Sequence, residues 1–188
     1  MPSPHLYDTI QDAVNYLKSQ SDLSPRFGLI LGTGLSGLAD EITDAIEIAY
    51  GDIPHFPVST VQSHRGKLIF GKLAGIPIVA MAGRFHYYEG YSMEQVTFPV
   101  RVMKFLGIER LIISNASGSV NPAIEAGDIV FVRDHINFMA DNPLRGHNDE
   151  RLGPRFPDML GTYDRQLNTQ ALQMARKMGI PAHEGIYL

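Results

Sequence analysis

The chain has 188 residues, of which 44% are hydrophobic, so it is long enough to bury one sizeable core and predicts a single α/β domain over residues 1–188. Its 16 Lys and Arg residues stand against 20 Asp and Glu residues, which excludes the basic excess that a nucleic-acid-binding protein needs, and no apolar run is long enough to span a membrane. Because the chain has no cysteine and no signal peptide pattern, we expect a cytoplasmic protein.

The first part of the chain predicts a helix, a buried strand and a glycine-rich turn. The helix has one apolar stripe at helical spacing, formed by Ile10, Ala13, Val14 and Leu17. The apolar run over 27–31 predicts the strand, and GTGLSG over 32–37 matches the GxGxxG pattern of dinucleotide-binding proteins, with Asp52 at about the usual distance of 20 residues. Only a short helix fits between this turn and a second possible strand from Ala45, which is little for a crossover between parallel strands.

The glycine-rich turn therefore favours a narrower interpretation, an anion-binding turn. Backbone N–H groups at a helix start, together with the Thr33 hydroxyl, can hold a small anion. The alternative, an ordinary turn from strand to helix, explains the glycines but gives Thr33 no role. The segment over 52–66 contains two prolines and no helical or strand period, so it predicts a loop, which carries His64.

A predicted hairpin leads to the densest group of reactive side chains in the sequence. Two β-rich runs between Lys67 and Gly83 turn at Ala74-Gly75. The second run is followed by Arg84, His86, Tyr87, Tyr88 and Glu89. Ligands of open α/β sheets bind beyond the carboxyl ends of the strands, and the planar donors of Arg84 suit phosphate or carboxylate, so this segment predicts an anion site.

The sequence allows more than one arrangement of the side chains in this segment. If the backbone is extended, His86 and Tyr88 face the same side, because side chains alternate along a strand. The alternative to an anion site is a surface ion pair between Arg84 and Glu89, with the aromatic residues capping the core.

The next elements are a capped helix and a short buried strand. Ser92 and Gln95 form a capping box for a helix that bends at Pro99. The apolar run over 111–113 predicts a strand, and small residues follow its carboxyl end at Asn115, Ala116, Ser117 and Gly118. This is the third strand end of that kind, and in a parallel sheet such ends open onto one rim.

The C-terminal part predicts two strands separated by a long loop and a helix. A strand begins at Ile129, and its Asp134 and His135 predict a hydrogen-bonded structural pair. The polar stretch over 137–163 is too long for a plain connection, which favours a functional or interfacial role, and it contains Phe156. A helix with apolar residues on one side follows at 167–178.

The final residues, HEGIYL, predict another strand that is still apolar at Leu188, so we expect that the C-terminal part of the domain is missing. The seven histidines do not recur at ligand spacing with carboxylates, so the sequence predicts no metal site.

A set of stretches, in order along the chain, resembles the purine nucleoside phosphorylases of the trimeric, low-molecular-mass family. They are GLILGTGLSGLA, STVQSHRGKLIFG, GRFHYYEGYS, NASGSVN, NPLRGHNDERLGPRFPDM and HEGIYL. Each is weak by itself, but the ordered set is specific. The resemblance implies an α/β fold of the nucleoside phosphorylase type, with a mixed β-sheet flanked by helices and its C-terminal part absent.

The activity that the resemblance implies is phosphorolysis of purine ribonucleosides and deoxyribonucleosides. Phosphate attacks C1′ and gives the free base and a pentose 1-phosphate, with inorganic phosphate as co-substrate and with no cofactor or metal. The expected partners are the nucleoside, phosphate and two further copies in a homotrimer, with no nucleic acid and no membrane. Glycosidic cleavage passes through an oxocarbenium-like cation, which a phosphate anion fixed below C1′ both attacks and stabilises.

The resemblance also assigns roles by matching position. It implies that phosphate is bound by Thr33, His64, Arg84, His86 and the backbone N–H of Ala116. Glu89 orients His86, and these two form the catalytic pair. Tyr88 contacts the ribose, Phe156 closes the ribose pocket of a neighbouring subunit, and the base lies beside Ser117 and Gly118.

Two alternatives to this function remain open. The sister family, 5′-methylthioadenosine phosphorylase, shares the chemistry and differs in the nucleoside. A non-catalytic domain that binds phosphate or nucleoside is the other, because the Glu and Asn that hold the purine in the family match nothing in this chain. For the same reason we expect the 188-residue chain by itself to be inactive.

Overall fold

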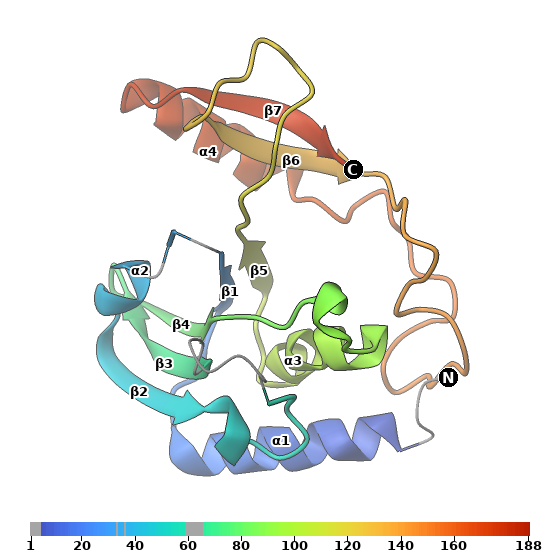
Figure 1. The fold of residues 1–188 in the computed structure, drawn as a ribbon. Coiled ribbons are helices and arrows are strands. Elements are labelled where there is room, and N and C mark those ends of the chain that lie inside the picture. The colour runs from blue at the N-terminus through green and yellow to red at the C-terminus, as the bar shows by residue number, and fades with distance from the viewer. Residues whose placement is uncertain (1–4, 33, 36, 59–65) are drawn as a thin grey trace. The chain divides into compact units, whose positions relative to one another are not determined.

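The structure is a computed structural model that describes residues 5–32, 34–35, 37–58 and 66–188 (Figure 1). Thr33 and His64 lie outside these described residues. By its contacts the chain divides into two compact units. Unit 1 comprises the residues up to Ala116 together with Asn142–Leu152, and unit 2 comprises Ser117–Asp141 and Gly153–Leu188. The single domain expected over residues 1–188 stays a prediction.

Unit 1 is built on a five-stranded mixed sheet with the strand order β2-β3-β4-β1-β5. The strands are β1 (Phe27–Leu31), β2 (Thr43–Ala49), β3 (Lys67–Leu73), β4 (Ile76–Ala82) and β5 (Arg110–Ile113). β1 pairs in parallel with both β4 and β5, whereas β3 pairs antiparallel with β2 and β4. The mixed α/β architecture expected from the sequence is therefore confirmed.

The three inner strands are apolar on both faces. Successive residues of a strand point to opposite sides, so a continuous apolar run buries side chains in two cores. One core receives Ile30, Leu68, Phe70, Val79 and Met81. The other receives Leu29, Leu31, Ile69, Ile78 and Ala80. The edge strand β2 buries only Ile48, which agrees with its position at the border of the sheet.

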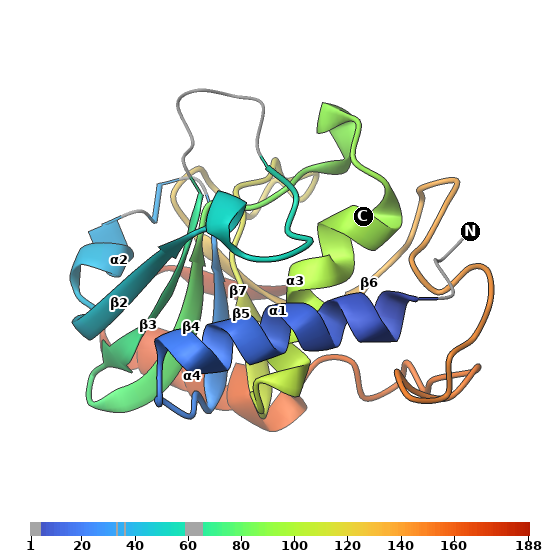
Figure 2. The same ribbon diagram turned by 90° about the horizontal axis from the view of Figure 1, so that it is seen from below.

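Helices cover both faces of the sheet of unit 1. α1 (Leu6–Gln20) and α3 (Met93–Phe105) lie on one face, where Figure 2 shows them side by side. α1 buries the predicted stripe of Ile10, Ala13, Val14 and Leu17. The four-residue α2 (Gly37–Asp40) packs on the other face. Two single 3₁₀ turns, Tyr50–Asp52 and Tyr87–Glu89, complete the unit.

The structure contains the hairpin turn and the helix cap that the sequence predicted. The β3–β4 hairpin turns at Ala74 and Gly75, both with positive φ, as a two-residue type I′ turn requires. The Ser92 hydroxyl accepts the Gln95 N–H at 3.2 Å, and the Gln95 side chain accepts the Ser92 N–H at 2.8 Å. The predicted capping box is thus confirmed at the start of α3. Pro99 lies inside this helix.

The GxGxxG pattern does not form a dinucleotide-binding unit. That unit needs a helix that crosses over to a parallel neighbour. α2 has four residues, and the strand after it is the antiparallel edge strand β2. The possible second strand from Ala45 begins two residues earlier, at Thr43.

Unit 2 consists of two parallel strands and one helix. β6 (Ile129–His135) pairs with β7 (Ala182–Tyr187), and α4 (Arg165–Lys177) packs against both. The expected hydrogen-bonded pair of Asp134 and His135 is confirmed, although the bond joins a side chain to a backbone group. Asp134 accepts the backbone N–H of His135 at 2.8 Å, and the imidazole of His135 lies 3.2 Å from the Tyr163 hydroxyl. In the described part of the chain, no helix is both long and apolar enough to cross a membrane.

Candidate functional site

The carboxyl ends of three parallel strands of unit 1 meet at one rim. Leu31, the last residue of β1, is in register with Ala82 at the end of β4. On its other side Ile30 is in register with Ile113 at the end of β5. The residues that follow these ends are Gly32, Arg84 and Asn115 with its neighbours, so the rim expected from the sequence is confirmed for unit 1.

Hydrogen bonds tie the three strand ends together through Ser114. The Ser114 hydroxyl accepts the Gly32 N–H at 2.9 Å and lies 3.3 Å from the Ile30 carbonyl oxygen, to which it donates. The Ser114 carbonyl oxygen accepts Nη1 of Arg84 at 2.8 Å. The strand ends also touch, since a Cβ at Gly32 would lie only 2.4 Å from that carbonyl oxygen.

The end of β4 is held from its other side by a buried tyrosine. Gly83, which has a φ of 98°, precedes Arg84, and its carbonyl oxygen accepts the Tyr50 hydroxyl at 2.6 Å. Burial raises the pKa of the Tyr50 phenol far above its ordinary value, so the hydroxyl stays protonated and remains a donor. The direction in which the chain enters the Arg84 segment is therefore fixed.

His86 and Glu89 form a hydrogen-bonded pair on the segment after β4. Nδ1 of His86 lies 2.5 Å from Oε1 of Glu89, and the same oxygen accepts the His86 N–H at 3.2 Å. A carboxylate acceptor at Nδ1 fixes the ring and leaves Nε2 for a ligand. Because Glu89 bonds to His86 and Arg84 bonds to Ser114, the alternative of an Arg84–Glu89 ion pair is wrong.

Tyr88 lies beside His86, but not for the expected reason. The two rings stack with centroids 4.8 Å apart and an angle of 20° between their planes. The segment is not extended, because Tyr87–Glu89 forms a 3₁₀ turn. The turn brings the two rings to the same side and leaves Tyr88 83% exposed.

The remaining predicted site residues that the structure describes are divided between the two units. The exposed Ala116 lies in unit 1, two residues after Ser114. Ser117, Gly118 and Phe156 belong to unit 2, where Phe156 is 87% exposed. Within the described part of unit 1, the structure brings together the strand-end residues and, on the segment after β4, the His86–Glu89 pair with Tyr88.

Two residues of the site, Ser114 and Tyr50, were not found from the sequence. Ser114 directly follows the apolar run over 111–113, a position that signals a rim residue. The strand that this run forms, β5, was expected to be buried, but it is mostly exposed. Tyr50 lies in a segment without any motif, and its contact with Gly83 joins residues far apart in the chain. Among the described residues, no group of three or more His, Cys, Asp or Glu side chains could hold a metal ion.

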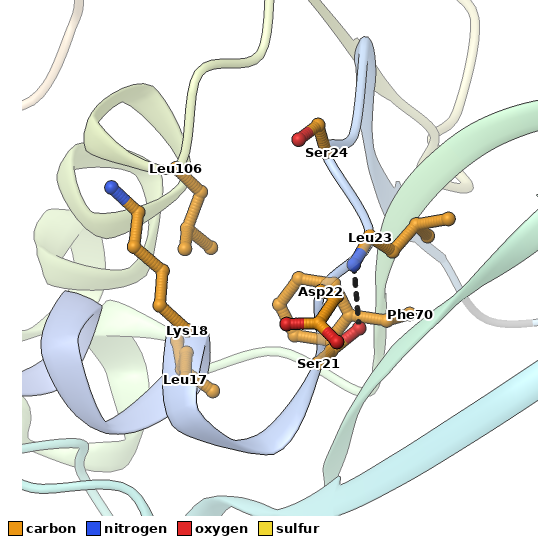
Figure 3. A pocket seen from close by; sticks show the side chains of 8 residues that line it. All are labelled: Leu17, Lys18, Ser21, Asp22, Leu23, Ser24, Phe70 and Leu106. Carbon is orange, nitrogen blue, oxygen red and sulfur yellow. Dashed lines mark hydrogen bonds between the residues drawn. The ribbon is translucent and has the colours of Figure 1, made fainter.

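A cavity of about 260 Å³ lies near the start of β1 (Figure 3). It is lined by Leu17, Lys18, Ser21, Asp22, Leu23, Ser24, Phe70 and Leu106. Ser21 and its neighbours connect α1 to the amino end of β1, whereas the rim lies at the carboxyl end. The cavity is therefore a separate feature from the candidate site.

The chain is similar to known proteins over nearly its whole length. Residues 26–188 match the family model described as the phosphorylase superfamily. Purine nucleoside phosphorylase 1 of Bacillus subtilis is 53% identical over 180 residues, which cover 96% of this chain and 66% of that protein. The enzyme of the same name from Geobacillus stearothermophilus is 54% identical, with 95% and 65% covered.

A solved structure of a purine nucleoside phosphorylase is also similar to this chain. This structure is the crystal structure of isoform 2 of purine nucleoside phosphorylase from Schistosoma mansoni, in complex with cytosine and ribose-1-phosphate. Its TM-score with the present chain is 0.92, and the two sequences are 42% identical. The match covers 96% of this chain and 65% of that chain. The present chain thus spans a little under two thirds of the length of these proteins. It belongs to the phosphorylase superfamily, in which it matches purine nucleoside phosphorylases over nearly its whole length.

Proposed function

We propose that the full-length protein catalyses the phosphorolysis of purine nucleosides to a free purine and a pentose 1-phosphate. The observation that carries the proposal is the rim of unit 1, where Arg84 and the His86–Glu89 pair follow the end of β4 beside the ends of β1 and β5. The relatives named purine nucleoside phosphorylase, and the complex of one of them with ribose-1-phosphate, support this choice of substrate and product.

Phosphate is the ligand for which the rim has suitable donors. The guanidinium of Arg84 offers five N–H donors in a planar fork, and one of its nitrogens is used on the Ser114 carbonyl oxygen. His86 would bind phosphate through Nε2 while Glu89 holds Nδ1. We assign the rest of the phosphate site to the backbone N–H of Ala116, to Thr33 and to His64. The last two lie outside the described residues, and their roles rest on the resemblance.

Positioning is the main contribution of such a site to the rate. The phosphate must lie below C1′ as the bond to the purine breaks, and holding two reactants in this geometry can lower a barrier by about 7 kcal/mol. The phosphate oxygens also stabilise the cationic sugar electrostatically. A nucleophilic Ser or Cys is not needed, because the bound anion is the nucleophile.

We assign the nucleoside contacts to the residues that the resemblance implies. Tyr88, stacked on His86 and exposed, would contact the ribose, and Ser117 and Gly118 would lie beside the base. Phe156 would close the ribose pocket of a neighbouring copy in a homotrimer, since a cyclic assembly lets the loop of one subunit complete the site of the next. Its 87% exposed side chain supports this assignment. A cytoplasmic location and the absence of a resident cofactor remain predictions.

The deciding experiment for the reaction is product analysis. Purified full-length protein is expected to split inosine into hypoxanthine and ribose 1-phosphate when phosphate is present, and to leave inosine intact in phosphate-free buffer. Phosphate is a reactant, so its omission removes the reaction. Equal cleavage rates with and without phosphate, with free ribose as the product, would contradict the proposal.

The same assay separates the alternatives. A 5′-methylthioadenosine phosphorylase would cleave the methylthio nucleoside in preference to inosine and guanosine. A non-catalytic binding domain would give a calorimetric signal for phosphate or nucleoside without any product. The relatives carry the name purine nucleoside phosphorylase, which supports this activity over that of a 5′-methylthioadenosine phosphorylase.

Replacing Glu89 by glutamine tests the role of the His86–Glu89 pair. The amide oxygen can still accept from His86 but carries no charge, and a hydrogen bond to a charged group is stronger than a neutral one by about 1 kcal/mol. Glu89→Gln is therefore expected to lower kcat/KM for phosphate roughly fivefold.

The matched control for this variant is Glu47→Gln. Glu47 forms an exposed ion pair with Lys67 on the sheet, and removal of its charge is expected to leave the phosphate kinetics unchanged. If Glu89→Gln retained the phosphate dependence of the parent, Glu89 would have no orienting role.

A further inference from the structure

We propose that Ser114 is the positioning residue of the phosphate site, because its hydroxyl and its carbonyl oxygen together fix the ends of β1 and β4 against the end of β5. This inference rests on the proposed function, since it concerns how the donors for phosphate are held. Ser114 itself is not assigned a contact with phosphate or nucleoside.

The hydroxyl of Ser114 bonds twice to the end of β1. It accepts the Gly32 N–H at 2.9 Å and donates to the Ile30 carbonyl at 3.3 Å, so one side chain satisfies a donor and an acceptor where the strand ends. A serine hydroxyl has one hydrogen and two lone pairs, which makes both bonds possible at once. Alanine could make neither bond, and the Gly32 N–H would lose its acceptor just before Thr33.

The backbone of Ser114 connects this junction to Arg84. Its N–H donates to the Ile30 carbonyl at 3.1 Å, and its carbonyl oxygen accepts Nη1 of Arg84 at 2.8 Å. Arg84 is half-buried, so a guanidinium in this place has few alternative positions. The placement of Ser114 therefore sets which way the remaining N–H donors of Arg84 point.

The chain after Ser114 carries the effect to a further donor. Ala116, whose backbone N–H is proposed to bind phosphate, lies two residues beyond it. A tetrahedral anion is bound well only when donors converge from several sides, and a misplacement of about 1 Å can cost a hundredfold in rate. One serine thus controls the end of β1 at Gly32, the direction of Arg84 and the approach to Ala116.

Close packing makes the junction rigid. A Cβ at Gly32 would meet the carbonyl oxygen of Ser114 at 2.4 Å and the Cα of Asn115 at 3.0 Å, so the two backbones lie in direct contact. The hydroxyl of Ser114 bonds across this contact. Its loss leaves the half-buried Gly32 N–H without this acceptor, and the strand ends must shift to satisfy it.

The test compares Ser114→Ala with Ser114→Thr in the full-length protein. Ser114→Ala is expected to raise KM for phosphate about tenfold, the change that corresponds to about 1.4 kcal/mol, while KM for inosine changes by less than about twofold. Threonine retains the hydroxyl, so Ser114→Thr is expected to recover most of the phosphate affinity. If the alanine variant does not fold, Ser114→Cys, with a weaker hydrogen-bonding group, takes its place with the same expected split between the two KM values.

Ser21→Ala is the matched control. Ser21 is buried, and its hydroxyl likewise accepts a backbone N–H, that of Leu23 at 3.2 Å, but it lies before β1 rather than after it (Figure 3). Its removal is expected to lower the Tm without a change in KM for phosphate.

Two outcomes would overturn the inference. One is an unchanged KM for phosphate in Ser114→Ala; the other is an equal rise in KM for phosphate and inosine, which a general loosening of the fold would cause. A parent protein without phosphate-dependent cleavage would instead refute the proposed function, so the two failures are distinguishable.

Discussion

Replacing Arg84 by alanine is expected to lower kcat/KM for phosphate by roughly ten- to a hundred-fold, because a hydrogen bond to a charged group contributes about 1.5–3 kcal/mol. The Tm should change little, since the packing of β4 depends on residues before Gly83 and the guanidinium contributes one bond, to the Ser114 carbonyl oxygen. Steady-state kinetics with phosphate varied at saturating inosine, together with thermal unfolding, measure both quantities.

Two further variants make the Arg84 test specific. Arg84→Lys keeps the charge but replaces a planar fork by a point charge, so it is expected to recover only part of the phosphate affinity. Arg26→Ala removes an arginine whose exposed ion pair with Glu109 lies at the start of β1, and it should leave the kinetics unchanged. If Arg84→Ala retained the phosphate kinetics of the parent, the segment after β4 would be structural only.

Replacing Gly32 by alanine is expected to destabilise unit 1 by about 3 kcal/mol, at the upper end of the cost of overpacking. The added Cβ would lie 2.4 Å from the carbonyl oxygen and 2.9 Å from the carbonyl carbon of Ser114. Both are backbone atoms of a neighbouring strand end, so no side-chain rotation can relieve the contact. Unfolding in urea, followed by circular dichroism, measures the loss.

Gly37→Ala controls for the loss of a glycine as such. A Cβ at Gly37 meets nothing within 4 Å, and this residue starts α2, where alanine is the better helix former. The control should therefore be neutral or slightly more stable than the parent. A Gly32→Ala protein that unfolds at the same urea concentration as this control would show that the strand ends can separate at little cost.

The sequence predicted the elements of the fold because each has a local cause. The helix stripe around Ile10 follows the helical period, and the Ala74-Gly75 turn follows from the two β-rich runs beside it. The common rim of three strand ends could be predicted as well, because Gly32, Arg84 and Asn115 each follow an apolar run. These signals lie within short windows of sequence.

The contacts that hold the site could not be predicted in this way. Ser114 bonds to Gly32 and Arg84, and Tyr50 bonds to Gly83, only after the order of the strands is set. The shared side of His86 and Tyr88 was expected on the condition of an extended backbone, but a 3₁₀ turn, with the Glu89 side chain bonded to the His86 N–H, produces it instead. Pairings between distant residues depend on the register of the whole sheet, which no local pattern contains.

The order of strands in unit 1 has a consequence for biosynthesis. Among the strands of unit 1, β1 is synthesised first, yet both strands that pair with it come much later in the chain. Phe27 pairs with Ile78 on one side and with Arg110 on the other. The β3–β4 hairpin pairs residues that are close in the sequence, so it can form as soon as both strands are synthesised. The backbone groups of β1 stay unpaired until β4 and then β5 have been synthesised. The nascent chain therefore carries the exposed apolar segment FGLIL for most of the synthesis of the unit, and this is the interval in which a holding chaperone would protect it.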